Sequence, residues 1–159
     1  MKAHELKKIV FFSLIAVFAS FSSSLCRAEM LLEVDQPSIN LGVISKQDLN
    51  VGYKEIGDTV NAYALRFTIS NPDAWNWTLE TRAETPYFSA NSGMKPCGDL
   101  AWRIDSLDMY NPFTITDAVI QSGNSISTTV DIDLKLSTSW FDTPDRYAIR
   151  LVFTLYGEI

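Results

Sequence analysis

The residues of this chain whose types suggest chemistry are aromatic side chains in segments without regular periodicity. Trp140 and Phe141 are adjacent and stand beside Asp142, while Tyr87 and Tyr110 fall in two other irregular stretches. Exposed aromatic rings are flat apolar surfaces of the kind on which sugar rings stack, so these four aromatic residues are candidate ligand contacts. For Trp140 and Phe141 we nevertheless expect that the rings close one end of the protein core, with exposure as the alternative.

The other tryptophans have a different setting. Trp75 and Trp77 alternate with polar residues and share a face with Leu79, and Trp102 stands in a similar alternating run. This pattern is typical of strands that bury one face. We therefore expect these three indole rings to lie in the core.

Cys97 is the one cysteine outside the first 28 residues, since Cys26 is the other cysteine of the chain. An exported protein with a single cysteine cannot form an internal disulfide. A thiol of this kind could pair with another chain, which makes Cys97 a candidate intermolecular contact. The interpretation that we prefer is a buried free cysteine, because free cysteine is among the most frequently buried residue types.

Residues 29–159 contain no histidine, since His4 is the only one in the chain. This excludes Ser/His/Asp and Cys/His catalytic arrangements and histidine-bearing metal sites from that region. Asp131 and Asp133 share one predicted strand face and could offer oxygens to calcium, but a solvated acidic face is the simpler interpretation. A carboxylate pair of the glycosidase kind stays open as an alternative, although nothing singles out two residues. We expect a non-enzymatic protein with no cofactor and no bound metal.

The N-terminus predicts export. Lys7 and Lys8 precede an uncharged, largely apolar run over residues 9–21, and small residues stand at Cys26 and Ala28, the positions that a signal peptidase reads. The run is too short to span a bilayer, which takes about 20 apolar residues. We expect residues 1–28 to be a cleaved signal peptide, so that no membrane span remains after processing. Residues 29–159 then form a single domain.

The charge of the processed chain limits its partners. Residues 29–159 hold 9 Lys and Arg against 18 Asp and Glu. Such an acidic excess repels the phosphates of nucleic acids and the surfaces of anionic membranes. We therefore expect no binding to nucleic acid.

Alternating apolar residues predict strands along most of residues 29–159. In the final run, the odd-numbered residues from Tyr147 to Leu155 are all apolar and are expected to face the core. The clear runs are 63–69, 75–79, 100–104, 130–136 and 147–156, and the less regular ones are 31–35, 39–44, 87–90 and 113–120.

The polar outer faces of these runs indicate antiparallel pairing. Parallel strands are buried on both faces and need crossover helices, for which the chain has no candidates. A single sheet would leave its apolar face in water, so two packed sheets are needed to bury it. We expect an all-β, antiparallel, immunoglobulin-like sandwich of about 7–9 strands.

The segment Pro144-Asp145-Arg146-Tyr147, which leads into the final run, resembles the closing hairpin of immunoglobulin-like domains in bacterial envelope and surface proteins. The resemblance implies that Tyr147 is a corner tyrosine whose hydroxyl bonds back to the preceding loop. An exported chain of this size is also similar to a pilus subunit, which implies assembly by strand addition between neighbours. Its single mature cysteine and its ending, Tyr156-Gly157-Glu158-Ile159, differ from the disulfide and penultimate tyrosine usual in chaperone-assembled subunits.

The expected role is a structural or adhesive module of the cell envelope or surface, acting in the periplasm, on the cell or outside it. Its partners would be other envelope or surface proteins, or further copies of itself in a larger assembly. The alternative is a carbohydrate-binding module that contacts glycans through its loop aromatic residues.

Overall fold

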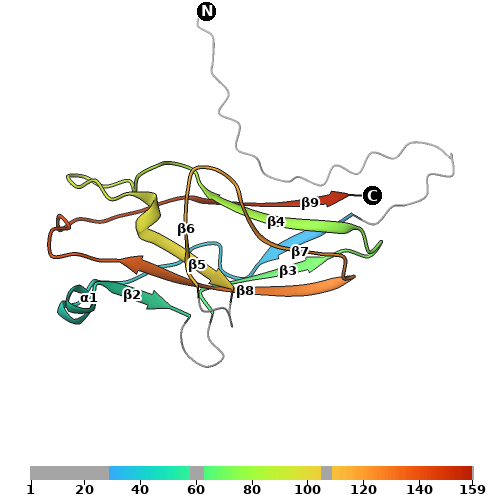
Figure 1. Ribbon diagram of the computed structural model, residues 1–159, viewed down its shortest axis with the longest axis horizontal. Coiled ribbons are helices and arrows are strands. Elements are labelled where there is room, and N and C mark those ends of the chain that lie inside the picture. Colours follow the sequence, from blue (N-terminus) through green and yellow to red (C-terminus); the bar gives the residue numbers. More distant parts are fainter. Residues whose placement is uncertain (1–28, 58–62, 105–108, 159) are drawn as a thin grey trace, which may run out of the picture.

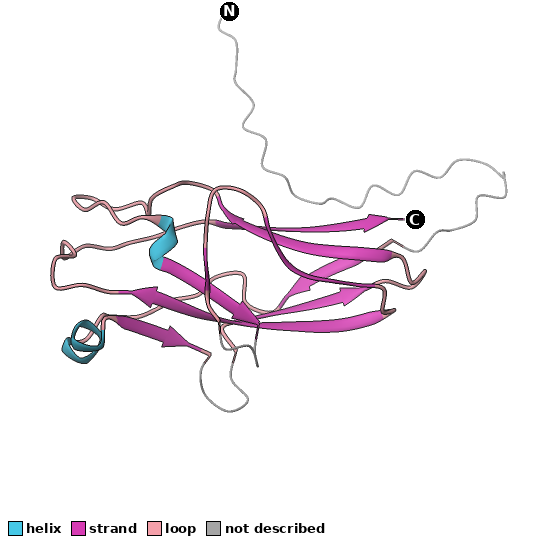
Figure 2. Ribbon diagram, in the orientation of Figure 1, coloured by secondary structure: helices cyan, strands magenta, loops and turns pink. Residues whose placement is uncertain are grey.

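The computed structural model describes residues 29–57, 63–104 and 109–158, and these residues form two packed β-sheets (Figures 1 and 2). Every strand pair is antiparallel, which confirms the expected all-β sandwich. The predicted signal peptide, residues 1–28, lies outside the described residues. No described helix is long and apolar enough to cross a membrane. The first sheet contains β1 (Leu31–Val34), β2 (Tyr53–Ile56), β3 (Leu65–Ser70), β5 (Leu100–Ile104), β6 (Asn111–Pro112) and β8 (Ser127–Ser137), and the second contains β4 (Asn76–Ala83), β7 (Ala118–Gly123) and β9 (Leu151–Glu158).

Strand β8 organises the first sheet because it pairs along both of its edges. On one edge, β3 pairs with residues 127–132 of β8 and β2 pairs with residues 134–137. On the other edge, β5 pairs with residues 132–136. The strand order is therefore β1-β3-β8-β5-β6, with β2 continuing the line of β3, whereas the second sheet has the order β7-β4-β9.

The core lies between the sheets and is built from alternate residues of their strands. Phe67 on β3 is fully buried, and its ring lies 4.6 Å from that of Phe153 on β9, which joins the two layers. Trp77 and Trp102 are buried as the alternation predicted, while Trp75 is half-buried at the edge. The odd-numbered residues of 147–155 all pack against the core, as expected, although they remain partly exposed.

Several element boundaries differ from the predictions. Residues 39–44 form no strand, and the chain instead makes a short helix, α1 (Lys46–Val51), followed by β2. The helix begins at Ser45, whose side chain accepts from the backbone N–H of Asp48 while the Asp48 carboxylate accepts from that of Ser45, and it ends at Gly52. Residues 87–90 make isolated bridges rather than a strand, and η1 (Cys97–Asp99) is a single 3-10 turn.

The outer face of β8 is not the solvated acidic surface that its sequence suggests. Asp131 receives two hydrogen bonds from Arg66, at 2.7 and 2.6 Å. Asp133 is 0% exposed, and its Oδ2 accepts from the Nε of Arg103 at 3.0 Å. Gly57, with a φ of 98°, lies so close to Asp133 that a Cβ at this position would overlap the carboxylate. The expectation for Asp133 is therefore wrong, because strand alternation cannot show that another segment covers the outer face.

Candidate functional site

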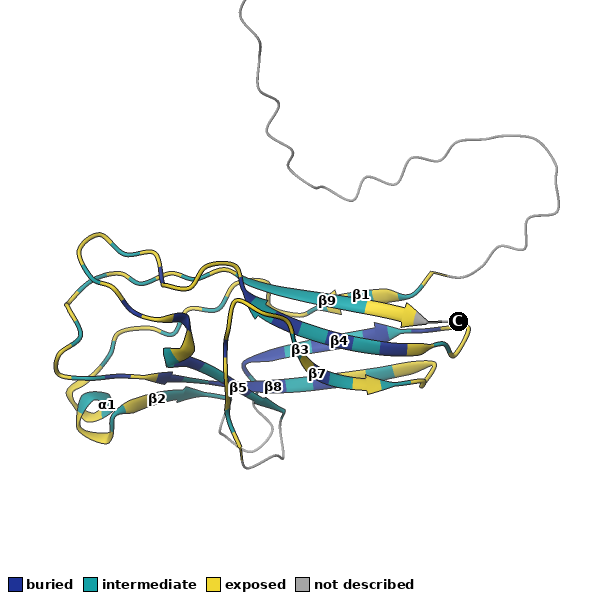
Figure 3. Ribbon diagram, turned by 45° about the horizontal axis from the view of Figure 1, so that its top comes forward, coloured by how far each residue is buried: buried dark blue, intermediate teal, exposed yellow. Residues whose placement is uncertain are grey.

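The two long sides of the sandwich differ in whether a segment of the chain crosses between the sheets. On one side, the chain crosses from β6 to β7, and a 2.8 Å hydrogen bond from the Ala83 N–H to the Thr114 carbonyl ties the crossing to β4. On the other side, β1 and β9 are the outermost strands of their sheets, and no described strand lies between them (Figure 3). We call this second side the seam.

The seam is lined by apolar side chains from both sheets. They are Leu32 and Val34 of β1 and Leu151, Phe153 and Leu155 of β9. All five pack against the core yet remain half-exposed, whereas the corresponding residues of β3, β4 and β8 are buried. The apolar side chains on these two edge strands therefore leave hydrophobic surface exposed to water. One further strand between β1 and β9 would cover that surface.

The backbone of β9 presents a regular free edge at the seam. Its eight residues pair with β4 without a register shift. The Glu84 N–H donates to the Arg150 carbonyl at 2.9 Å, which fixes the alternation: even-numbered residues bond to β4. The N–H and C=O groups of Leu151, Phe153 and Leu155 therefore point to the free edge, where no described strand meets them.

This edge lacks the features that protect sheet edges from pairing. Natural edges are short, charged, bulged or interrupted by proline. Strand β6 has two residues, including Pro112, β1 and β2 have four residues each with Glu33 and Lys54 among them, and β7 faces a register shift in β4. By contrast, β9 runs Leu-Val-Phe-Thr-Leu-Tyr-Gly before its only charged residue, Glu158. Among the described edge strands, β9 is therefore the long one whose first seven residues carry no charge.

The seam is closed at one end by Met30. A Cβ at Gly157 would lie 2.8 Å from the Met30 Cε and 3.3 Å from the Trp75 ring, so glycine is the residue that permits this approach. Towards the other end, Ile39, Leu41 and Ile44 pack against the core after β1 ends.

The sequence-based ligand residues lie away from the seam. Trp140 and Phe141 are 59% and 96% exposed, so the expectation that they close the end of the core is wrong. Their loop has a defined conformation, because the Asp142 carboxylate accepts from the Ser139 N–H at 3.0 Å and from Lys95 at 2.9 Å. The local hydrogen bonds hold the loop without burying its two rings.

The structure brings one of the other two candidate aromatic residues near this loop. Tyr87 is exposed and bridges to Pro96, in the same hairpin as Lys95, which binds Asp142. Tyr110 lies elsewhere, with Arg103 and Lys135 placed over its ring at 4.7 and 4.2 Å on the first sheet. The four aromatic residues therefore do not form one surface.

Cys97 is buried, as expected for a free cysteine, and its thiol donates to the Phe113 carbonyl at 3.4 Å. The thiol thus lies at the crossing between the sheets, on the side opposite the seam. The structure places no second cysteine near it within the described part of the chain.

The hairpin that precedes β9 is tied to its neighbours by Asp145 and Tyr147. The Tyr147 hydroxyl donates to the Thr143 carbonyl at 2.6 Å, which confirms the predicted corner tyrosine. The Asp145 carboxylate accepts from the N–H and hydroxyl of Ser92 and from Asn91. The backbone N–H groups of Ser92 and Arg146 are the main reason that the pKa of Asp145 lies well below its usual value.

Replacing Asp145 with Asn should lower the melting temperature at neutral pH. It should also make the melting temperature fall less steeply as the pH is lowered. A carboxyl with a depressed folded pKa contributes stability above its unfolded pKa, about 3.9, and this contribution is lost as pH falls through the lower folded value. Thermal melts from pH 7 to pH 2 check this expectation. The exposed Asp73, whose side chain makes no hydrogen bond in the described part of the chain, provides the control Asp73→Asn. Parallel curves for the wild type and D145N would contradict it.

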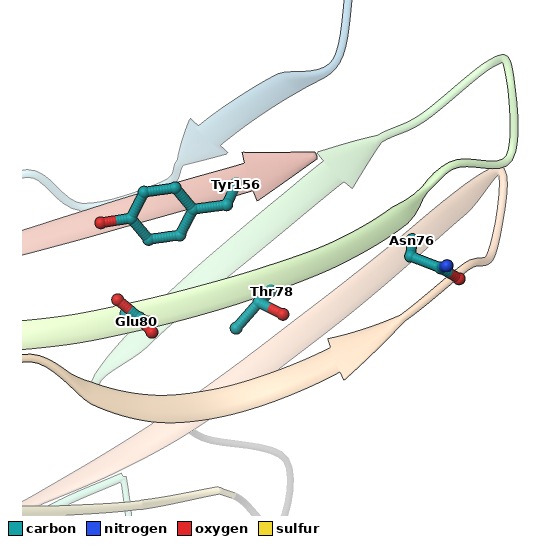
Figure 4. A pocket seen from close by; sticks show the side chains of 4 residues that line it. All are labelled: Asn76, Thr78, Glu80 and Tyr156. Atoms are coloured by element: carbon teal, nitrogen blue, oxygen red, sulfur yellow. The ribbon is translucent and has the colours of Figure 1, made fainter. Parts of the chain in front are cut away.

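A small groove on the outer face of the second sheet was not predicted. It has a volume of about 160 Å³ and is lined by Asn76, Thr78 and Glu80 of β4 and by Tyr156 of β9 (Figure 4). Tyr156 lies opposite Thr78 in the register, and the Thr78 hydroxyl bonds to that of Ser122 at 3.0 Å. The sequence signal for this face is only the alternation of β4, which does not distinguish a groove from an ordinary solvated face.

The comparisons with known proteins concern the fold. No family model matches the chain, and no curated protein matches it. Among solved structures, it is similar to a chain in the structure of a chaperone–usher pilus reported to reveal the molecular basis of rod uncoiling. The TM-score is 0.51 at 11% identity, and the match covers 90% of this chain and 96% of that one. The similarity thus extends over nearly the whole sandwich.

Proposed function

We propose that the protein is a structural subunit of an exported surface assembly and that the free edge of β9 receives an extended strand from a neighbouring polypeptide. The observation that carries this proposal is the eight-residue, unbulged and almost uncharged edge of β9 beside half-exposed apolar residues. Strand addition supplies main-chain hydrogen bonds for affinity and pockets for alternate side chains for specificity. The similarity in fold to a pilus chain supports the same role.

This role is non-enzymatic and follows export. An added strand would bond to the backbone of Leu151, Phe153 and Leu155 and cover their side chains together with those of Leu32 and Val34. Such a subunit acts in the periplasm, at the cell surface or outside the cell, in keeping with the export signal that the N-terminus predicts. The acidic composition suits a soluble subunit awaiting assembly.

Hydrogen exchange tests the proposal without altering the chain. In the isolated monomer, the amides of Leu151, Phe153 and Leu155 should exchange about 100-fold faster than those of Val152 and Thr154, which bond to β4. In material purified from its own cells in assembled form, all five amides should be protected. Light scattering after size-exclusion chromatography establishes which samples are monomers and which are assemblies. Slow exchange at all five positions in a monomer would contradict the proposal.

Binding of a glycan at the loop of Trp140 is a second candidate function, favoured by the exposure of two adjacent rings on a loop held by Asp142. Trp140→Ala should abolish any signal on a glycan array, whereas Tyr156→Ala, which removes an exposed ring from the groove of the second sheet, should not. The reverse pattern would assign the sugar to that groove. An array without any signal would remove this candidate.

A further inference from the structure

The basic residues of the protein are absent from one end of the sandwich. The Met30 end consists of residues 29–34, 67–80, 119–130 and 154–158, whose strand residues pair with one another within the two sheets. These segments contain no lysine, arginine or histidine. They contain five acidic residues, namely Glu29, Glu33, Asp73, Glu80 and Glu158.

The rest of the sandwich holds all nine lysine and arginine residues of 29–159 together with thirteen acidic residues. Six of these cations form ion pairs in the described structure, such as Arg82 with Asp117 at 3.4 Å and Arg150 with Glu84 at 3.1 Å. At the Met30 end, no cation of the described chain lies within ion-pair distance of Glu33 or Glu80. These two carboxylates are therefore not ion-paired within the described structure.

Two of these acidic residues flank the place where a strand would add. Glu33 lies on β1, opposite Thr68, and is exposed. Glu80 lies on β4, opposite Thr154 of β9, and lines the outer groove. A strand beside β9 would run about 10 Å from β4, since neighbouring strands are spaced by about 4.8 Å. At low salt this separation falls within the Debye length. Charges on the added strand would therefore interact with the carboxylates of Glu33 and Glu80.

From this arrangement we infer that the partner of the seam is a basic segment of a different protein, with apolar residues facing the core and Lys or Arg at the outward positions. The inference rests on the proposed function and names the chemistry of its partner. A second copy of this chain fits less well, because residues 29–159 hold 9 Lys and Arg against 18 Asp and Glu, and like charges at an interface suppress association. Complementary charge chiefly raises the association rate and selects among partners.

Three synthetic peptides of about 12 residues test the inference. They share one set of apolar residues at alternate positions and carry Lys, Ser or Glu at the positions between. Fluorescence anisotropy against the full processed chain should show that the Lys peptide binds at least about tenfold more tightly than the Glu peptide in 20 mM salt. The difference should shrink in 300 mM salt.

Paired variants locate the effect on the protein. Glu33→Gln combined with Glu80→Gln should slow association of the Lys peptide about threefold to tenfold at low salt. Glu84→Gln combined with Asp117→Asn removes the same number of charges from the rest of the sandwich. This pair of changes should leave the association rate of the Lys peptide unchanged. Equal affinities for the three peptides would overturn the inference while leaving strand addition intact. Binding by none of them would instead contradict the proposed function, and the inference with it.

Discussion

Replacing Arg103 with Met is expected to lower the free energy of unfolding by about 3 to 5 kcal/mol, which is the usual consequence of removing one partner of a buried ion pair. Asp133 has no exposed surface, and Arg103 donates to it at 3.0 Å with only 18% of its own side chain exposed. Without Arg103, the carboxylate would stay under Gly57 in a poorly solvated position. Urea denaturation followed by tryptophan fluorescence measures the loss.

The matched control for this variant is Arg66→Met on the same sheet face. Arg66 makes a bidentate bond to Asp131, but the two side chains are 37% and 22% exposed. Water screens the attraction between exposed ions and solvates the one that remains, so the loss should be much smaller than for Arg103. Equal losses in the two variants would show that burial of Asp133 does not set the size of the effect.

The predictions from sequence that are confirmed are mainly those in which the two-residue period of a strand determines whether a side chain faces the core. The alternation of 147–155 predicted the inward face of β9, and the same reasoning placed Trp77 and Trp102 in the core. Tyr147 was predicted through its resemblance to a corner tyrosine, and its hydroxyl makes the expected local bond to Thr143. These features depend on neighbours close in sequence or on a period of two residues.

The features that could not be predicted depend on segments that are distant in the chain. Burial of Asp133 requires Gly57 and Arg103, which the sequence does not connect with β8. Exposure of Trp140 depends on how Lys95 fixes the loop from a separate hairpin. The free edge of β9 also depends on segments that are distant in the chain. The alternation of β9 shows which of its faces is buried, but not whether a second strand pairs with it. The candidate site therefore emerged from strand order rather than from any motif.

Phe67 joins the two sheets, and its replacement by Ala should be as damaging as the loss of Arg103. The side chain is fully buried on β3, and its ring lies 4.6 Å from that of Phe153 at the seam. Truncating a buried phenylalanine removes transfer free energy and leaves a cavity, which together cost about 3 to 5 kcal/mol. Chemical denaturation of F67A checks the size of this loss.

Phe141→Ala is the same chemical change at a side chain that is 96% exposed, and it should alter the free energy of unfolding by no more than about 0.5 kcal/mol. The comparison also bears on the seam, because Phe67 supports Phe153, whose backbone groups form part of the free edge. F67A should therefore weaken capture of an apolar strand peptide under conditions where the variant remains folded, whereas F141A should not. If F67A captured the peptide as tightly as the wild type while folded, Phe153 would be positioned by its own pairing with β4 alone.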